Sequence, residues 1–345
     1  MASKRQVPFD YDGHLIFNEV CRVNEYNEDL PKDVNELENR LLGRLPRFEE
    51  STYYEPGSGY QRVPIREYIE DSKLPPQTKQ FLDNSVALEY RYEDYSTTEA
   101  VVDGERREVA VPKEKTADIF WGSNEYMLFR GSEADASKAK GQTNTSFGRG
   151  VRLESIDFEE DFLLWLFRKA HDTGELTDSL KINRLSDAEI SGSRDEFGGE
   201  ARINKSNDIK QSEAILLGLL KGKHFAMIEG DFTVFYSNRT SATVRTEIQN
   251  NKIYVKASKA GLKNASKVEK LGLSTHITSE LASLYDHWKS LPSSEKFVSP
   301  EFMVQLIETC HERDIDLNRQ PIAVLRRQVQ KRGESLSDYD FELDL

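Results

Sequence analysis

Residues 207–257 read NDIKQSEAILLGLLKGKHFAMIEGDFTVFYSNRTSATVRTEIQNNKIYVKA, and this stretch decides the fold. It begins with residues that cap helices well and continues with Ile and Leu side chains spread over a wide helical arc. It then reaches Gly222, which suits the left-handed residue that ends a helix. We therefore expect a buried helix over residues 207–222. The residues that follow, 224–236, favour strands, and Gly230-Asp231 predicts a break between two of them.

Two further strands are expected after this point. Residues 241–249 alternate, with Ala242 and its even-numbered neighbours on one side and Arg245 and its odd-numbered neighbours on the other. Asn250-Asn251 predicts a turn, and residues 252–257 alternate again. Short strands joined by tight turns pair antiparallel. The expected fold class is α+β, with mainly antiparallel sheets packed with amphipathic helices and a helical C-terminal part.

Upstream, the sequence predicts two hairpins and two loops. Asp103-Gly104 lies between strand-like runs and is a type I′ turn signal. Residues 119–130 predict a second hairpin. The small and polar residues of 132–150 and of 187–204 are typical of loops.

The remaining helices are predicted from their apolar spacing and their ends. One begins at Asp157, with acids in its first turn, bases in its last and Gly174 after it. Thr275 is expected to cap another helix, and two more follow at 299–310 and 321–332. Cys310 lies on the apolar stripe of the first of these two, so we expect it to be buried.

Composition and these elements together suggest four regions. They are an N-terminal α+β region (1–115), a central α+β domain (116–292), C-terminal helices (293–333) and an acidic-apolar tail (334–345). The boundary near residue 115 is placed at the Pro-Lys-Glu-Lys-Thr run that starts at Pro112.

Charge is unevenly distributed along the 345 residues. The chain carries a net charge of −13, but residues 201–270 hold 13 Lys and Arg against 6 Asp and Glu, a net charge of +7. A local field is what a phosphate group experiences, so this basic segment points to a polyanion. Eight cations are its expected nucleic-acid contacts: Arg239, Arg245, Lys252, Lys256, Lys259, Lys263, Lys267 and Lys270. The alternative is a solvated surface with no ligand.

A metal-dependent nuclease is the second hypothesis. Strand alternation places Glu247 and Gln249 on one face, and Asp231 can approach from the neighbouring strand. Two carboxylates can hold Mg²⁺, but Gln249 stands where such sites carry a lysine. Accidental pairs of this kind are common in antiparallel sheets.

The C-terminal tail alternates strictly between apolar and acidic residues. Tyr339, Phe341 and Leu343 form its apolar side, which would face a partner if the tail is extended. We expect either a docking segment for a protein partner, which adds a strand to that partner or covers the chain's own lysines, or a final strand of the protein's own sheet.

Other function classes lack support in the sequence. No phosphate-binding loop, dinucleotide fingerprint or nucleophile elbow occurs, the six histidines show no metal-ligand spacing, and no cofactor is expected. Cys21 and Cys310 form no C-x-x-C pair, which favours a reducing cytoplasm. Without a long apolar run or an N-terminal apolar segment, no membrane partner is expected.

These observations favour a non-enzymatic cytoplasmic binding protein with a basic face for nucleic acid, DNA or RNA, or another polyanion. An accessory role in a prokaryotic defence or regulatory system, such as antiviral defence, is a further expectation that no motif supports.

Overall fold

The structure is a computed structural model that describes residues 15–25, 30–31, 33–50, 55–122, 125–195, 198–204, 206, 208–237, 240–257, 259, 262–315, 317 and 320–339. It is a mixed α+β protein with antiparallel strand pairing and helices in its C-terminal part, so the expected fold class is confirmed. The chain forms two compact units. Unit 1 comprises residues 1–156, 251–254 and 264–279, and unit 2 comprises residues 157–250, 255–263 and 280–345.

Unit 1 contains an antiparallel sheet in the order β2-β3-β4-β5-β1, with β6 also paired to β1. Its strands are β1 Leu15–Glu25, β2 Ser58–Arg62, β3 Val86–Val102, β4 Glu105–Trp121, β5 Tyr126–Arg130 and β6 Val151–Ser155. The hairpin predicted at 119–130 is confirmed as β4 and β5.

Helices cover this sheet. Leu37 and Leu41 of α1 (Val34–Arg44) share a buried cluster with Ala136, Ala139 and Phe147 of α3 (Glu133–Phe147) and with the strands. Around the buried Phe120 and Leu128 lie η1 (Ile65–Tyr68), α2 (Pro76–Asp83) and the first half of α6 (Lys267–Ser290). The loop predicted at 132–150 is therefore wrong. Its small residues form a helix, because Ser132 caps it and the sheet buries Ala136 and Ala139.

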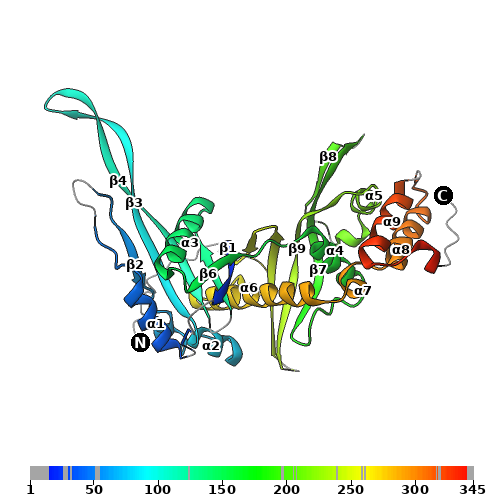
Figure 1. Cartoon of the computed structure of the whole chain (residues 1–345), viewed down its shortest axis with the longest axis horizontal. Helices are drawn as coiled ribbons and strands as arrows, with labels where there is room; N and C mark the ends of the chain where they lie inside the picture. The colour runs from blue at the N-terminus through cyan, green and yellow to red at the C-terminus, as the bar shows by residue number, and fades with distance from the viewer. Residues whose placement is uncertain are drawn as a thin grey trace. The chain divides into compact units, whose positions relative to one another are not determined.

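The β3–β4 hairpin is longer than the rest of its sheet and projects from unit 1 (Figure 1). Its two strands stay in register over their full length, from Val86 opposite Trp121 to Val102 opposite Glu105. Asp103 (φ 54°) and Gly104 (φ 81°) form the two-residue turn, which confirms the predicted type I′ signal. β4 runs without interruption through Pro112.

Unit 2 contains four antiparallel strands, in the order β10-β9-β7-β8. These strands are β7 Leu180–Asp195, β8 Gly198–Ile203, β9 His224–Ser237 and β10 Thr240–Gln249. The next strand along the chain, β11 (Lys252–Val255), has its first three residues in unit 1. The loop predicted at 187–204 is wrong, since most of it belongs to β7 and β8. The predicted break at Gly230 is also wrong. A Cβ on Gly230 would lie 2.5 Å from the carbonyl oxygen of Arg184, so this glycine permits a close approach of β7 rather than a turn.

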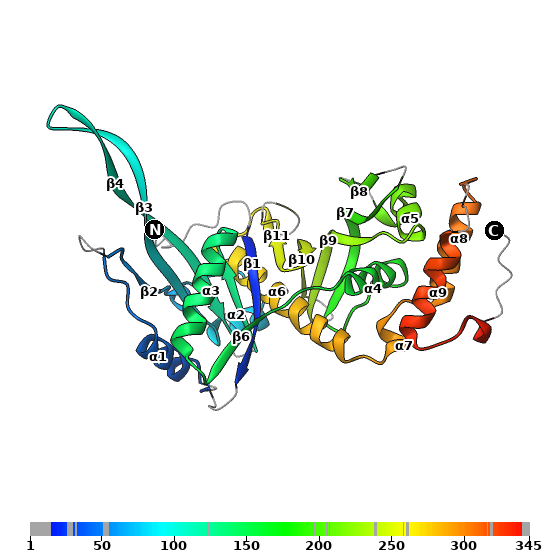
Figure 2. The same ribbon diagram turned by 45° about the horizontal axis from the view of Figure 1, so that its top comes forward.

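The helices of unit 2 are α4 Glu160–His171, η2 Ile209–Gln211, α5 Glu213–Leu220, the second half of α6, α7 Ser293–Lys296, α8 Pro300–His311, α9 Gln320–Arg332 and η4 Leu336–Asp338. α4 packs on β7 and β9, and α8 packs on α9 and α5 (Figure 2). The helix predicted over 207–222 is shorter than expected: Asp208 caps the 3₁₀ turn η2, and α5 begins only at Glu213. Gly222 has φ 83°, as predicted for a helix end.

Two more sequence expectations are settled by α6 and by the cysteines. Thr275 lies inside α6, where its hydroxyl donates to the carbonyl oxygen of Leu271, so the predicted cap is wrong. Cys310 in unit 2 is buried as predicted, and Cys21 is buried in unit 1. Both thiols are free. None of the described helices has the length and apolar character needed to cross a membrane.

Candidate functional site

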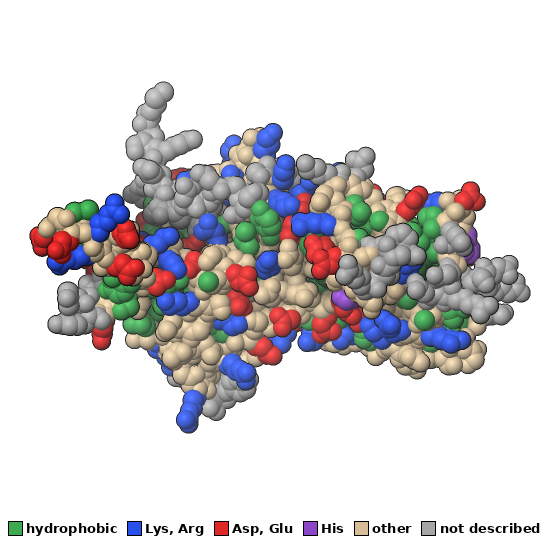
Figure 3. Space-filling model, turned by 90° about the horizontal axis from the view of Figure 1, so that it is seen from above, with side chains coloured by type: hydrophobic (Ala, Val, Ile, Leu, Met, Phe, Trp, Pro, Cys, Tyr) green, Lys and Arg blue, Asp and Glu red, His purple; other side chains and the backbone are tan. Residues whose placement is uncertain are grey.

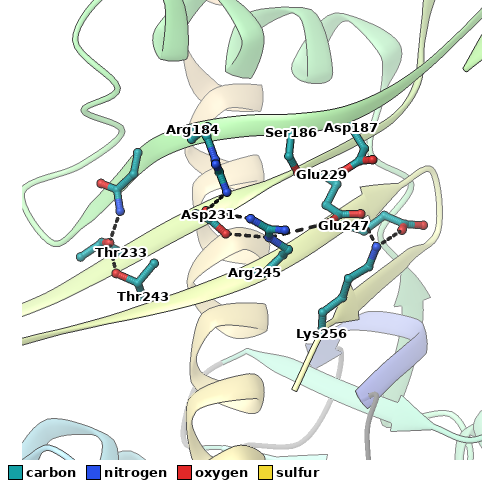
Figure 4. Close-up of polar contacts among 11 residues, drawn as sticks. Arg184, Ser186, Asp187, Glu229, Asp231, Thr233, Thr243, Arg245, Glu247 and Lys256 are labelled. Atoms are coloured by element: carbon teal, nitrogen blue, oxygen red, sulfur yellow. Dashed lines mark hydrogen bonds and ion pairs between the residues drawn. The ribbon is translucent and has the colours of Figure 1, made fainter. Parts of the chain in front are cut away.

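One face of the unit 2 sheet carries a network of charged and polar side chains (Figure 4). Along β9 the odd positions Glu229, Asp231 and Thr233 point to this face, as do Arg245 and Glu247 of β10. The even positions of both strands hold buried residues, mostly apolar: Ile228, Gly230, Phe232, Val234, Val244, Thr246 and Ile248. The alternation predicted for 241–249 is thus confirmed, and it separates an apolar face from a polar one.

Strand register brings three acids into one row. Asp187 of β7 lies opposite Glu229 of β9, which lies opposite Glu247 of β10. The β7–β9 register shifts three times, and two of the shifts, between Ile182 and Arg184 and between Leu185 and Asp187, precede the pairing of Asp187. These bulges place Asp187 in the row, because each extra residue re-aims the side chains that follow it.

The next row is an ion-pair cluster centred on Asp231. Arg245 binds it with two hydrogen bonds, Nε to Oδ1 at 2.7 Å and an NH2 nitrogen to Oδ2 at 3.0 Å. Arg184 donates to Oδ2 at 2.9 Å. The carboxylate of Asp231 therefore accepts three hydrogen bonds from two guanidinium groups, the geometry in which Arg–carboxylate pairs are strongest.

A second cluster joins the row of acids to Lys256. The Lys256 ammonium group donates to Glu229 and lies 3.5 Å from Oε2 of Glu247. Gln249 donates to the other oxygen of Glu247. The side chains of Glu229 and Glu247 are only 5% and 6% exposed, so the lysine neutralises two carboxylates that are largely out of water.

Burial and charge shift the pKa values of this network in opposite directions. Burial raises the pKa of Glu229, and Asp187 and Glu247 add to this effect, while Lys256 opposes it. Burial also disfavours the charged form of Asp231, but Arg245 and Arg184 outweigh it and hold that pKa below its usual value. Glu229 therefore takes up a proton more easily than Asp231 does.

The three candidate catalytic residues meet on this face, with a different division of roles from the one expected. Asp231, Glu247 and Gln249 all belong to it, but Asp231 is held by arginines, and Glu229 rather than Asp231 stands beside Glu247. Within the part of the chain that the structure describes, no three His, Cys, Asp or Glu side chains are grouped in a way that could hold a metal ion.

The predicted nucleic-acid contacts divide into three groups. Arg245 and Lys256 are neutralised by the acids of the network. Lys252, Lys259, Lys263 and Lys270 form no ion pair with any described side chain, and Lys259 and Lys263 are exposed. Lys267 has a polar partner, and Arg239 lies outside the described residues. On the face drawn in Figure 3, basic and acidic side chains are interspersed.

Only one of the three docking residues of the tail can be placed. Tyr339 donates its hydroxyl hydrogen to Glu334, which also accepts a hydrogen bond from Nε of Arg332 at 2.7 Å. Phe341 and Leu343 lie outside the described residues.

The sequence reasoning missed Arg184, Asp187 and Glu229. One signal for Glu229 was present, because the polar residues at 229, 231 and 233 alternate with apolar ones and with Gly230. No comparable signal marks Asp187, whose position depends on the bulges of β7.

No protein-family model matches this chain, and no curated protein matches it in sequence.

Proposed function

We propose that the protein binds nucleic acid or another polyanion, without cleaving it, through lysines that no carboxylate of the described residues neutralises. The observation that supports this proposal is a difference between lysines. Lys259 and Lys263 are exposed and form no ion pair with a described side chain, whereas Lys256 is paired with Glu229. Free ammonium groups contact phosphates without reading sequence. The expected binding is therefore non-specific and dependent on salt.

The test is a titration of fluorescently labelled DNA and RNA. We expect dissociation constants of roughly 10⁻⁴–10⁻⁶ M at moderate salt, the range typical of non-specific contacts. The triple variant K259Q/K263Q/K270Q removes three of the unpaired cations and should weaken binding about tenfold or more. Its matched control is R106Q/K113Q/R326Q, which removes three exposed cations outside the basic segment. Equal losses in the two variants would show that only total charge matters, and the proposal would be wrong.

One observation favours the nuclease as a second candidate. Nuclease sites of this kind carry a lysine where this chain has Gln249. Lys256, which follows β11, brings an ammonium group to within 3.5 Å of Glu247 instead. Two carboxylates can hold a Mg²⁺ ion that cleaves a phosphodiester, and a lysine beside them can stabilise the charge that develops. Against this candidate, the lysine already occupies the space between the carboxylates.

Incubation with supercoiled plasmid and Mg²⁺ or Mn²⁺ separates the two candidates. We expect the plasmid to remain intact, because the acids are satisfied by Lys256 and not arranged around a metal. Cleavage that needs the metal, and that disappears in both E247Q and E229Q but not in Q61A, would instead establish the nuclease. Gln61 lies in β2 of unit 1 and takes no part in the network.

A further inference from the structure

Three side chains of unit 2 lie in contact in a row that no sequence motif indicated, joined by one hydrogen bond and one close carboxylate contact. The hydroxyl of Ser191 in β7 lies 3.1 Å from Nε2 of His224, at the start of β9. On the other side of the ring, Nδ1 of His224 lies 3.3 Å from Oε2 of Glu160, the first residue of α4. The order is serine, imidazole, carboxylate.

Local packing accounts for this arrangement. Ser191 and His224 are opposite each other in the β7–β9 register. The residue after the serine is Gly192, where a Cβ would lie 3.1 Å from Cα of Lys223, so the absence of a side chain lets the two segments approach closely. α4 packs on β7 and β9, and its first turn carries Glu160.

The geometry matches the division of labour in a serine nucleophile system. A carboxylate at Nδ1 favours the tautomer that carries its hydrogen there and leaves the lone pair of Nε2 free to accept from the serine hydroxyl. The same constellation occurs on unrelated folds and is recognised by geometry and roles rather than by sequence position. The imidazole is 43% exposed, so substrate and water can reach it.

A pocket adjoins this chain, and His224 and Glu160 both line it. It offers about 50 Å³ of space, which holds on the order of four water-sized groups. Gln328 of α9 also lines it and is 6% exposed, and its Oε1 has no hydrogen-bond partner among the described residues. A buried acceptor without a donor is costly, so a ligand that brings an N–H or O–H would be favoured there.

The charges of the pocket suggest what it selects. Asp161 is paired with Lys331 at 2.7 Å, and Glu160 faces Nδ1 of His224. Arg327, also in the lining, forms no ion pair with a described side chain. A guanidinium group without a partner suits a carboxylate.

We propose that Ser191, His224 and Glu160 are the nucleophile, general base and positioning residue of a serine hydrolase that acts on small esters bearing a carboxylate. Ser191 Oγ attacks the ester carbonyl carbon while its proton passes to Nε2 of His224. The tetrahedral intermediate collapses, the C–O bond to the alcohol breaks, and His224 returns the proton to the leaving alcohol. Water then attacks the acyl-serine with His224 again as base, releasing the acid and restoring the serine. This activity is independent of polyanion binding by the lysines.

A fluorophosphonate probe and two 4-nitrophenyl esters test the proposal on the full chain. We expect the probe to label the wild-type protein, with mass spectrometry placing the adduct on Ser191. S191A should lose labelling and hydrolysis, whereas S193A, two residues along the same strand, should keep both. H224Q should lower kcat by about 100-fold or more, as loss of a general base does. A wild-type protein without an adduct on Ser191 would overturn the assignment, whatever the variants do.

Two further variants separate specificity and positioning from structure. R327Q should raise KM about tenfold for the mono-4-nitrophenyl ester of succinic acid and leave 4-nitrophenyl acetate unaffected, while its neighbour variant R326Q changes neither. E160Q should lower kcat about tenfold or more at unchanged KM, and E160D should restore part of the loss. If R327Q leaves KM for the succinate ester unchanged, or raises KM equally for both esters, Arg327 does not select a carboxylate. If E160Q is as active as the wild type, Glu160 takes no part in the mechanism.

Discussion

Glu229 and Asp231 are two residues apart on one strand and point to the same face, yet their environments shift their pKa values in opposite directions. Asp231 has two arginines and keeps its charge, so its contribution to stability is present above its unfolded-state pKa and is lost as pH falls through its lower folded-state pKa. Glu229 has a raised pKa, so the folded state binds its proton more tightly than the unfolded state does. Its contribution therefore favours folding at low pH and is lost as pH rises through the folded-state pKa.

This contrast leads to a prediction for Lys256. In K256M, two largely buried carboxylates face each other, and the cation that remains near them is Arg245, 3.9 Å from Glu229 and already bound to Asp231. The free energy of unfolding at pH 7.5 should therefore fall by about 3 kcal/mol. Loss of the lysine raises the pKa of Glu229 further, so protonation becomes easier and the deficit should be smaller when unfolding is measured at pH 5. Urea unfolding at the two pH values measures both effects. K252M, which removes a lysine that forms no ion pair with a described side chain, should change stability by less than about 0.5 kcal/mol. If K256M behaves like K252M, the network does not carry the charge coupling described.

Sequence reasoning found part of this site because strand alternation is visible in residues. It placed Arg245, Glu247 and Gln249 on one face and brought Asp231 to them, as the structure does. It did not place Asp187 on this face, because the bulges of β7 shift the strand register and no single residue in the sequence predicts a bulge. The serine, histidine and glutamate of the proposed hydrolase come from three elements whose proximity depends on tertiary packing alone.

At the scale of elements, the strands of the β3–β4 hairpin have a buried part near the base and an exposed outer part. Near its base the strands are buried between helices, whereas from Asp94 to Lys113 the side chains are exposed or half-buried, and Tyr95, Val101 and Val111 are among the few large apolar residues in contact with water. The turn at Asp103-Gly104 was predictable because both positions need positive φ. The length was not, because Pro112 resembles a boundary. β4 pairs only with β3 at this point, so a proline without an N–H is tolerated on its open side.

We predict that the outer part of this hairpin adds nothing to the stability of unit 1. Removing Tyr95–Ala100 together with Arg107–Pro112 deletes six residues from each strand, and an even number keeps the inward and outward faces in phase. Because the deleted side chains bury little apolar surface, the melting temperature should change by no more than about 2 °C. Removing five residues from one strand and six from the other should lower it, since the faces then mismatch. A large loss in the even deletion would mean that the outer hairpin is part of the core.

At the scale of the whole molecule, the two units are built from segments that alternate along the chain. Residues 251–254 and 264–279 belong to unit 1, while residues 255–263 between them belong to unit 2. Composition read along a sequence proposes contiguous regions, so an arrangement of this kind has no signature in charge or hydropathy. The α+β class was nevertheless predictable, because it depends on local periodicity and on short turns, which the sequence displays directly.

Each unit contains one buried cysteine, whose rate of modification reports how fast that unit opens. Cys21 lies in unit 1 and Cys310 in unit 2, and no other cysteine occurs in the chain. Burial raises the pKa of Cys21 to about 12 and also raises that of Cys310, so neither thiol forms a reactive thiolate while its surroundings stay closed. A thiol reagent added to the native protein therefore modifies each site only as fast as that unit opens. Mass spectrometry of the two cysteine-containing peptides follows both modifications in one sample, and the protein needs no substitution.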